Sequence, residues 1–148
     1  MPRLKIERPE PIIFSTTYTV RITDINYGGH VGNDSILAIV HDARVQFLSS
    51  LGLSELDVGS ATALIMTQAQ ITYLGESFHG DVLQIELGVD EVTSRSFELI
   101  FCITNTANGK DIARARTAML GFNYTTKKVS ALPATFLSKF SESVTEGV

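Results

Sequence analysis

The sequence lacks three features that would each indicate a particular class of protein. It has one cysteine, Cys102, so an intrachain disulfide is excluded and no cysteine–histidine cluster indicates zinc. It has 12 basic against 16 acidic side chains, whereas a nucleic-acid-binding protein normally has a basic surplus. It has no apolar run long enough to span a bilayer, and residues 1–11 do not resemble a signal peptide. We therefore expect a cytoplasmic protein that binds no nucleic acid, no membrane and no metal.

The length and composition are those of a single globular domain. The chain has 148 residues, of which 44% are apolar and 19% charged, and this composition is not that of a disordered protein. We expect one domain over residues 1–148, with flexible ends at residues 1–11 and 141–148. Cys102 could act as a nucleophile, but it lies in the apolar run 97–103, which favours a buried packing thiol.

Periodicity predicts one strand, one long helix and then a series of strands. The first strand covers residues 12–23, and a glycine-rich segment, residues 24–33, separates it from the helix over residues 34–51. Gly52 ends the helix. The later elements are strands at 61–74, 83–89, 97–103 and 112–124, with Asn108-Gly109 as a tight hairpin turn and a short helix after Leu132-Pro133.

This order of elements predicts an α+β fold in which an antiparallel sheet covers one side of the long helix. Ile36, Val40, Ala43 and Phe47 form the helix stripe that we expect to face the sheet. The outer face of the sheet is not fully polar, since small residues recur there with Ile100 and Met119. Partner subunits are therefore expected on the sheet.

The segment of residues 20–51 resembles the signature of the 4-hydroxybenzoyl-CoA thioesterase branch of the hot-dog superfamily. The matching residues are Arg21, Asp24, Gly29, His30, Val31 and Asn33, followed by Asp42, Ala43 and Arg44. Further matches lie at Gly80-Asp81, Arg95-Ser96-Phe97 and Leu132-Pro133. The resemblance implies a hot-dog fold, with an antiparallel sheet wrapped around one long central helix. It also implies hydrolysis of acyl thioesters by a homodimer or homotetramer, with coenzyme A (CoA) as part of the substrate and no other cofactor.

One position departs from this pattern. The catalytic aspartate of the family corresponds to Asn26, and an asparagine cannot act as an anionic nucleophile or base. The related broad-range acyl-CoA hydrolases carry Asp-x-Asn-x-x-Gly here, and their asparagine positions the thioester or the water. An acid on the central helix is then the base, and by residue count it corresponds to His41, with Asp42 adjacent.

Thioester hydrolysis needs donors for the developing oxyanion, and the first turn of a helix supplies free amides and a positive dipole end. The resemblance places Gly29, His30, Val31 and Asn33 around the thioester, with the amide of Asn33 or a neighbour on its carbonyl. The glycines would let the substrate approach the backbone, although they could equally serve only to shape a turn.

Three residues are candidates for the base. Asp42 lies on a small, polar face of the helix, which also fits simple solvent exposure. His41 lies on a more apolar face, and its ordinary pKa near neutrality suits a base, although packing is the commoner role there. Asp24 ends the first strand, where an aspartate often pins the following loop.

Arg95 matches the basic residue with which the family contacts CoA phosphates, but Thr93 and Ser94 stand where arginines are expected. A thioester of an acyl carrier protein therefore stays open beside acyl-CoA. Arg114 and Arg116 share one face of the last strand and could contact phosphates or form ordinary ion pairs.

Two other functions stay open. The missing aspartate is compatible with a non-catalytic protein that binds acyl thioesters. A hot-dog hydratase or dehydratase would use His30 with Asp24 or Asp42 as an acid/base pair. In the hydratase signature the histidine follows the aspartate by five residues, whereas His30 follows Asp24 by six.

Overall fold

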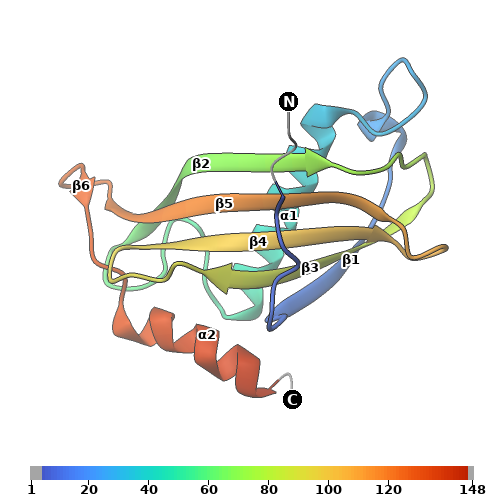
Figure 1. The fold of residues 1–148 in the computed structure, drawn as a ribbon. Helices are drawn as coiled ribbons and strands as arrows, with labels where there is room; N and C mark the ends of the chain where they lie inside the picture. Colours follow the sequence, from blue (N-terminus) through green and yellow to red (C-terminus); the bar gives the residue numbers. More distant parts are fainter. Residues whose placement is uncertain (1–4, 147–148) are drawn as a thin grey trace.

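A computed structural model describes residues 5–146, and side chains up to residue 140 are considered below. Figure 1 shows one sheet with the long helix on one face. The elements are β1 (Phe14–Thr19), η1 (Ile22–Asp24), α1 (Asn33–Ser50), β2 (Ala63–Tyr73), β3 (Val82–Asp90), β4 (Ser96–Asn105), β5 (Asp111–Asn123), β6 (Lys128–Val129) and α2 (Ala134–Glu146). The strands are antiparallel in the order β1-β3-β4-β5-β2, and β6 pairs with β5.

The main core lies between α1 and the sheet. The helix residues predicted to face the sheet are buried, and the inward row of β4 meets them. That row is Phe97, Leu99, Phe101 and Ile103. Because successive strand residues point to opposite faces, one row of each strand covers the helix. The predicted α+β architecture is confirmed, and the observed bounds of α1 differ from the predicted ones by one residue at each end.

The N-terminal segment, residues 5–11, lies across the opposite face of the sheet. Figure 1 shows this segment crossing β5, β4 and β3 on the face away from α1. Ile6 is buried, its carbonyl accepts a hydrogen bond from Arg114, and Arg8 bonds Glu86 at 2.9 Å. Residues 5–11, which we expected to belong to a flexible end, are thus packed against the sheet. Ile100 and Cys102 are buried on this face, and burial raises the pKa of the Cys102 thiol, as expected for a packing residue.

α2 closes the core near the C-terminal end of α1. Phe140 lies 5.2 Å from Phe97 and 6.5 Å from Phe47, and Phe136 lies 5.5 Å from Phe97, between ring centroids. The backbone of α2 continues to Glu146, inside the segment 141–148 that we expected to be flexible.

Several local expectations are corrected. β1 ends at Thr19 rather than at residue 23, because the chain turns into η1 there. The amide of Arg21 donates to the carboxylate of Asp24 at 2.8 Å, and the amide of Asp24 donates to the carbonyl of Arg21 at 2.9 Å. Five residues, 106–110, connect β4 to β5, so Asn108-Gly109 is part of a longer turn in which only Gly109 has a positive φ of 70°. Met119 is buried in the main core rather than on the outer face.

Among the helices of residues 5–146, none combines the length and the apolar character that crossing a membrane requires.

The contact between Gly88 and the N-terminal segment gives a stability prediction. A Cβ on Gly88 would lie 2.3 Å from the Cβ of Pro9. Gly88→Ala should therefore lower the free energy of unfolding by about 1–3 kcal/mol, the usual cost of overpacking. Urea unfolding of the purified variant measures this. Pro9→Gly removes the clashing atom, so the alanine should cost much less in that background, and an equal cost in both backgrounds would contradict the packing.

Candidate functional site

A pocket of about 250 Å³ lies beside the N-terminal end of α1. It is formed where the loop after β2 meets the residues that precede the helix. The residues that line it are His30, Val31, Asn33, Ile36, Tyr73, Gly75, Glu76, Ser77 and Ile112. It therefore combines an imidazole, a carboxylate, a hydroxyl and the start of a helix with apolar side chains.

Backbone hydrogen bonds fix the start of α1 from two sides. The amide of Val31 donates to the carbonyl of Ser77 at 2.9 Å, and the amide of Gly32 donates to the carbonyl of Asp24 at 3.0 Å. The hydroxyl of Tyr73, at the end of β2, donates to the carbonyl of Asn33 at 3.3 Å. The helix start is thus held against the end of β2 and the loop that follows it.

The first two amides of α1 donate to no group in the described part of the chain. The amides of Ser35 and Ile36 donate to the carbonyl of Gly32, but those of Asn33 and Asp34 have no acceptor within residues 5–146. Free amides at a helix start carry partial positive charge and favour an anionic oxygen. Asn33 also lines the pocket, as the expected oxyanion site requires.

The glycine-rich loop folds on itself around Asn26. The side-chain oxygen of Asn26 accepts from the amide of Gly28 at 2.9 Å, and its backbone bonds both His30 and Gly29. Gly29 has a φ of 86°, a left-handed conformation that favours glycine. In the free chain Asn26 and Gly29 therefore shape the turn that presents His30 to the pocket, and neither residue lines the pocket itself.

Asp24, at the end of η1, is held by Tyr18 of β1 and by Arg21. Its carboxylate accepts from the hydroxyl of Tyr18 at 2.7 Å and from the amide of Arg21 at 2.8 Å. The pKa of Tyr18 is raised to about 12, because the phenol is partly buried and because it donates to this carboxylate. Asp24 thus occupies the loop-pinning position.

His41 and Asp42 engage different partners along α1. The imidazole of His41 lies 3.3 Å from Glu55, which also accepts a 2.7 Å bond from the buried Arg44. The carboxylate of Asp42 accepts from Gln46 at 2.7 Å. Nine residues of helix, about 14 Å of rise, separate Asp42 from Asn33. Neither residue lines the pocket at the helix start of the same chain.

Arg95 lies at the opposite end of the sheet from the pocket. It precedes β4, whose first residue Ser96 pairs with Leu120, whereas Ile103 pairs with Ala113 near the pocket. Seven strand residues, about 23 Å, separate the two ends. Of the expected site residues, the structure brings together His30, Val31 and Asn33, with Asp24, Asn26 and Gly29 in the adjoining loop.

Glu76 and Ser77 are pocket residues that the sequence did not indicate. Glu76 is exposed, and its carboxylate has no partner within residues 5–146. Ser77 is 1% exposed. Both stand in the loop between β2 and β3, more than forty residues after the glycine-rich segment, and no spacing connects them to it. The one sequence feature that could have indicated a site there is Glu76 itself, a single acidic residue in the short loop between Gly75 and Gly80.

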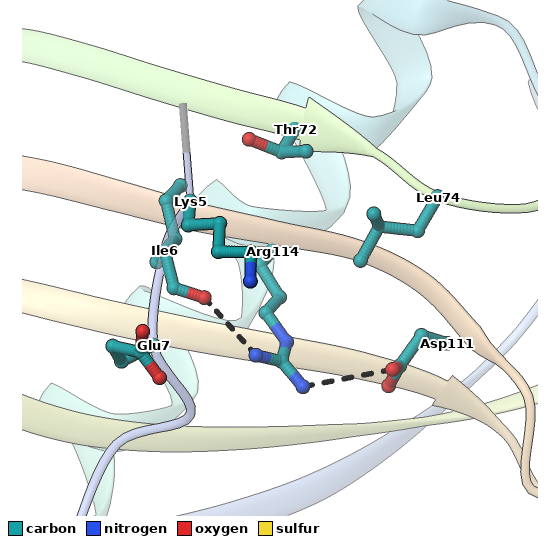
Figure 2. A pocket seen from close by; sticks show the side chains of 7 residues that line it. All are labelled: Lys5, Ile6, Glu7, Thr72, Leu74, Asp111 and Arg114. Atoms are coloured by element: carbon teal, nitrogen blue, oxygen red, sulfur yellow. Dashed lines mark hydrogen bonds and ion pairs between the residues drawn. The ribbon is translucent and has the colours of Figure 1, made fainter. Parts of the chain in front are cut away.

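A hollow of about 360 Å³ lies on the outer face of the sheet. There the guanidinium of Arg114 donates to the carbonyl of Ile6 at 3.0 Å and forms an ion pair with Asp111 at 3.5 Å (Figure 2). Lys5 and Glu7 also line it, so two cations are matched by two acids. Arg114 therefore secures the N-terminal segment, and the hollow has no net positive charge that would indicate a phosphate site. Arg116 pairs with Glu98 at 2.7 Å, an ordinary ion pair.

Comparison with known proteins gives one consistent result. The model of the thioesterase-like superfamily matches residues 20–140. A 1,4-dihydroxy-2-naphthoyl-CoA hydrolase from Acaryochloris marina is 31% identical over 120 residues, which are 79% of this chain and 88% of that protein. A 1,4-dihydroxy-2-naphthoyl-CoA thioesterase from Synechocystis superposes with a TM-score of 0.80 at 24% identity, covering 87% of this chain and 96% of that one. A Staphylococcus aureus protein in complex with CoA has a TM-score of 0.77 at 22% identity, covering 96% and 87%. These superpositions confirm the expected hot-dog fold.

The Tyr18–Asp24 hydrogen bond gives a pH prediction. A pKa above the ordinary tyrosine value of 10.0 means that the folded state favours the protonated phenol. This stabilisation is therefore complete below pH 10.0 and is lost as the pH rises toward 12. Asp24→Asn should lower the pKa of Tyr18, measured from phenolate absorbance. Tyr18→Phe identifies the signal, since the chain has 4 tyrosines. An unchanged high-pH titration in Asp24→Asn would contradict the bond.

Proposed function

Because the chain belongs to the thioesterase-like superfamily, we propose that it hydrolyses acyl-CoA thioesters at the pocket beside the start of α1. One observation carries the proposal. The helix begins with two amides that have no partner among residues 5–146, and its first residue, Asn33, shares a pocket with a carboxylate and an imidazole. Donors for an oxyanion and a base for water are the two requirements of this hydrolysis.

The free amides of Asn33 and Asp34 are the oxyanion donors in this proposal. When water attacks the carbonyl carbon, the carbonyl oxygen gains negative charge, and the amides with the helix dipole stabilise it. Because hydrogen bonds from Val31 and Gly32 hold the helix start, these donors are in place before the reaction begins. Donors fixed in this way need no reorganisation when the charge develops.

Glu76 is the base that the geometry favours. Glu76 lines the pocket, whereas the carboxylate of Asp24 is hydrogen-bonded to Tyr18. Asp42 is hydrogen-bonded to Gln46 and lies about two and a half helical turns beyond Asn33. Glu76 would take a proton from the attacking water, and collapse of the tetrahedral intermediate would then break the carbon–sulfur bond. This releases a carboxylic acid and the CoA thiol. The imidazole of His30, which lines the same pocket, would donate a proton to the departing sulfur.

The apolar part of the pocket is proposed to hold the acyl group. Ile36, Tyr73 and Ile112 line it beside the polar residues, and its volume of about 250 Å³ suits a compact acyl group. The named relatives act on an aromatic acyl-CoA, which is the substrate class to test first. CoA would be the thiol part of the substrate and not a separate cofactor.

Assembly as a homodimer or homotetramer stays a prediction. Leu37 and Val45 are 38% and 42% exposed on α1, one turn on either side of His41. A partner subunit that covers this stripe would bury apolar surface. In such an assembly, His41, Asp42 or Arg95 of one chain could approach the pocket of another.

The assignment of the base is tested by a pair of variants. Glu76→Gln keeps the size of the side chain but removes the base, so kcat should fall about 10²- to 10⁴-fold. The measurement is release of free thiol from a panel of aromatic and aliphatic acyl-CoAs. Asp42→Asn makes the same carboxylate-to-amide change at the competing candidate for the base, and it should lose much less activity if Glu76 is the base. If Asp42→Asn abolished turnover and Glu76→Gln retained it, the base would lie on the helix instead.

The same panel separates the alternative functions. A non-catalytic binder would bind acyl-CoA without releasing thiol from any of them, and that result would overturn the proposal. A hydratase would change the absorbance of an enoyl thioester reversibly, again with no thiol released.

A further inference from the structure

Ser77 has a buried hydroxyl that no described residue contacts by a hydrogen bond. The residue is 1% exposed, and its Oγ is one of three buried side-chain polar atoms without a partner in the described part of the chain. Leaving a buried polar group without a hydrogen bond is unfavourable, because the group has lost its contacts with water. Such a group is uncommon in folded proteins, and a ligand that completes its hydrogen bonds is one physical reason for it.

The position of Ser77 connects this hydroxyl to the proposed site. Ser77 lines the pocket, and its carbonyl accepts the amide of Val31, two residues before the first helical residue Asn33. It also follows Glu76 directly in the chain. One backbone hydrogen bond therefore fixes Ser77 beside the start of α1.

We infer that the Ser77 hydroxyl is a further donor to the thioester carbonyl oxygen, acting beside the free amides at the start of α1. The inference rests on the proposed function and deepens it by naming a substrate-contacting side chain. A serine hydroxyl has one donor, and its hydrogen rotates about the Cβ–Oγ bond, so it can point toward an oxygen bound beside it. No base is bonded to Ser77 within residues 5–146, so its role is to donate a hydrogen bond rather than to attack the substrate.

Thr117 provides a matched contrast. Its hydroxyl also has no hydrogen-bond partner among the residues that the structure describes, and the residue is fully buried on β5. Thr117 does not line the pocket at the helix start. An effect on catalysis that came only from removing a buried orphan hydroxyl would therefore appear in Thr117 variants as well.

The test compares kinetics with stability in two variants. Ser77→Ala should lower kcat about tenfold to a thousandfold, as losing an oxyanion donor does, while KM changes little. Its free energy of unfolding should be unchanged or higher, because no hydrogen bond is lost. Thr117→Val should retain the wild-type kcat. Undiminished kcat in Ser77→Ala, with an active wild type, would overturn the role of Ser77 alone. A wild type that releases no thiol from any acyl-CoA would overturn the proposed function and this inference together.

A spectroscopic measurement covers the case in which Ser77→Ala loses both activity and stability. In the Glu76→Gln background, where turnover is slow, the infrared stretch of an isotope-labelled thioester carbonyl reports the hydrogen bonds to its oxygen. Adding Ser77→Ala should shift this stretch to higher frequency, because a donor is lost. Adding Thr117→Val should leave it in place. An unshifted stretch in the Ser77→Ala double variant would show that the hydroxyl does not contact the carbonyl.

Discussion

The hydrogen bond from the amide of Val31 to the carbonyl of Ser77 is the contact on which the proposed site depends. It joins the loop after β2 to the residue that precedes the helix by two positions. Through it, Glu76 and Ser77 reach a helix start that lies more than forty residues earlier in the sequence. The second bond, from Gly32 to Asp24, consumes the next amide, so the first amides left free belong to Asn33 and Asp34.

The rest of the fold keeps this junction in place. The buried stripe of α1 packs on the inward rows of the sheet, and α2 covers the far end of the core with Phe136 and Phe140. The N-terminal segment covers the other face, where Arg114 and Glu86 hold it. A densely packed core leaves the elements that border it little room to move. The helix start, which hydrogen bonds hold from two sides, therefore presents its amides in one geometry.

Much of this arrangement could be predicted from the sequence, because local pattern determines it. Periodicity located α1, and the resemblance of residues 20–51 indicated His30, Val31 and Asn33, which do share one pocket. Met119 was assigned to the outer face because both rows of β5 contain small or apolar residues. Met119 is an even number of residues from Ala113 and Ala115 on β5, so it shares their inward face and lies in the core. Glu76 and Ser77 escaped prediction because only tertiary packing brings their loop to the helix. His41, Asp42 and Arg95 match a family pattern, but a sequence match cannot say which chain's pocket a side chain approaches.

A crystal structure with a non-hydrolysable acyl-CoA analogue tests the central claim most directly. We expect the oxygen that replaces the thioester carbonyl oxygen to lie about 3 Å from the amide nitrogen of Asn33 or Asp34. The acyl group would then lie against Ile36, Tyr73 and Ile112. An analogue bound with that oxygen away from both amides, for example beside Asp42 and Gln46, would contradict it.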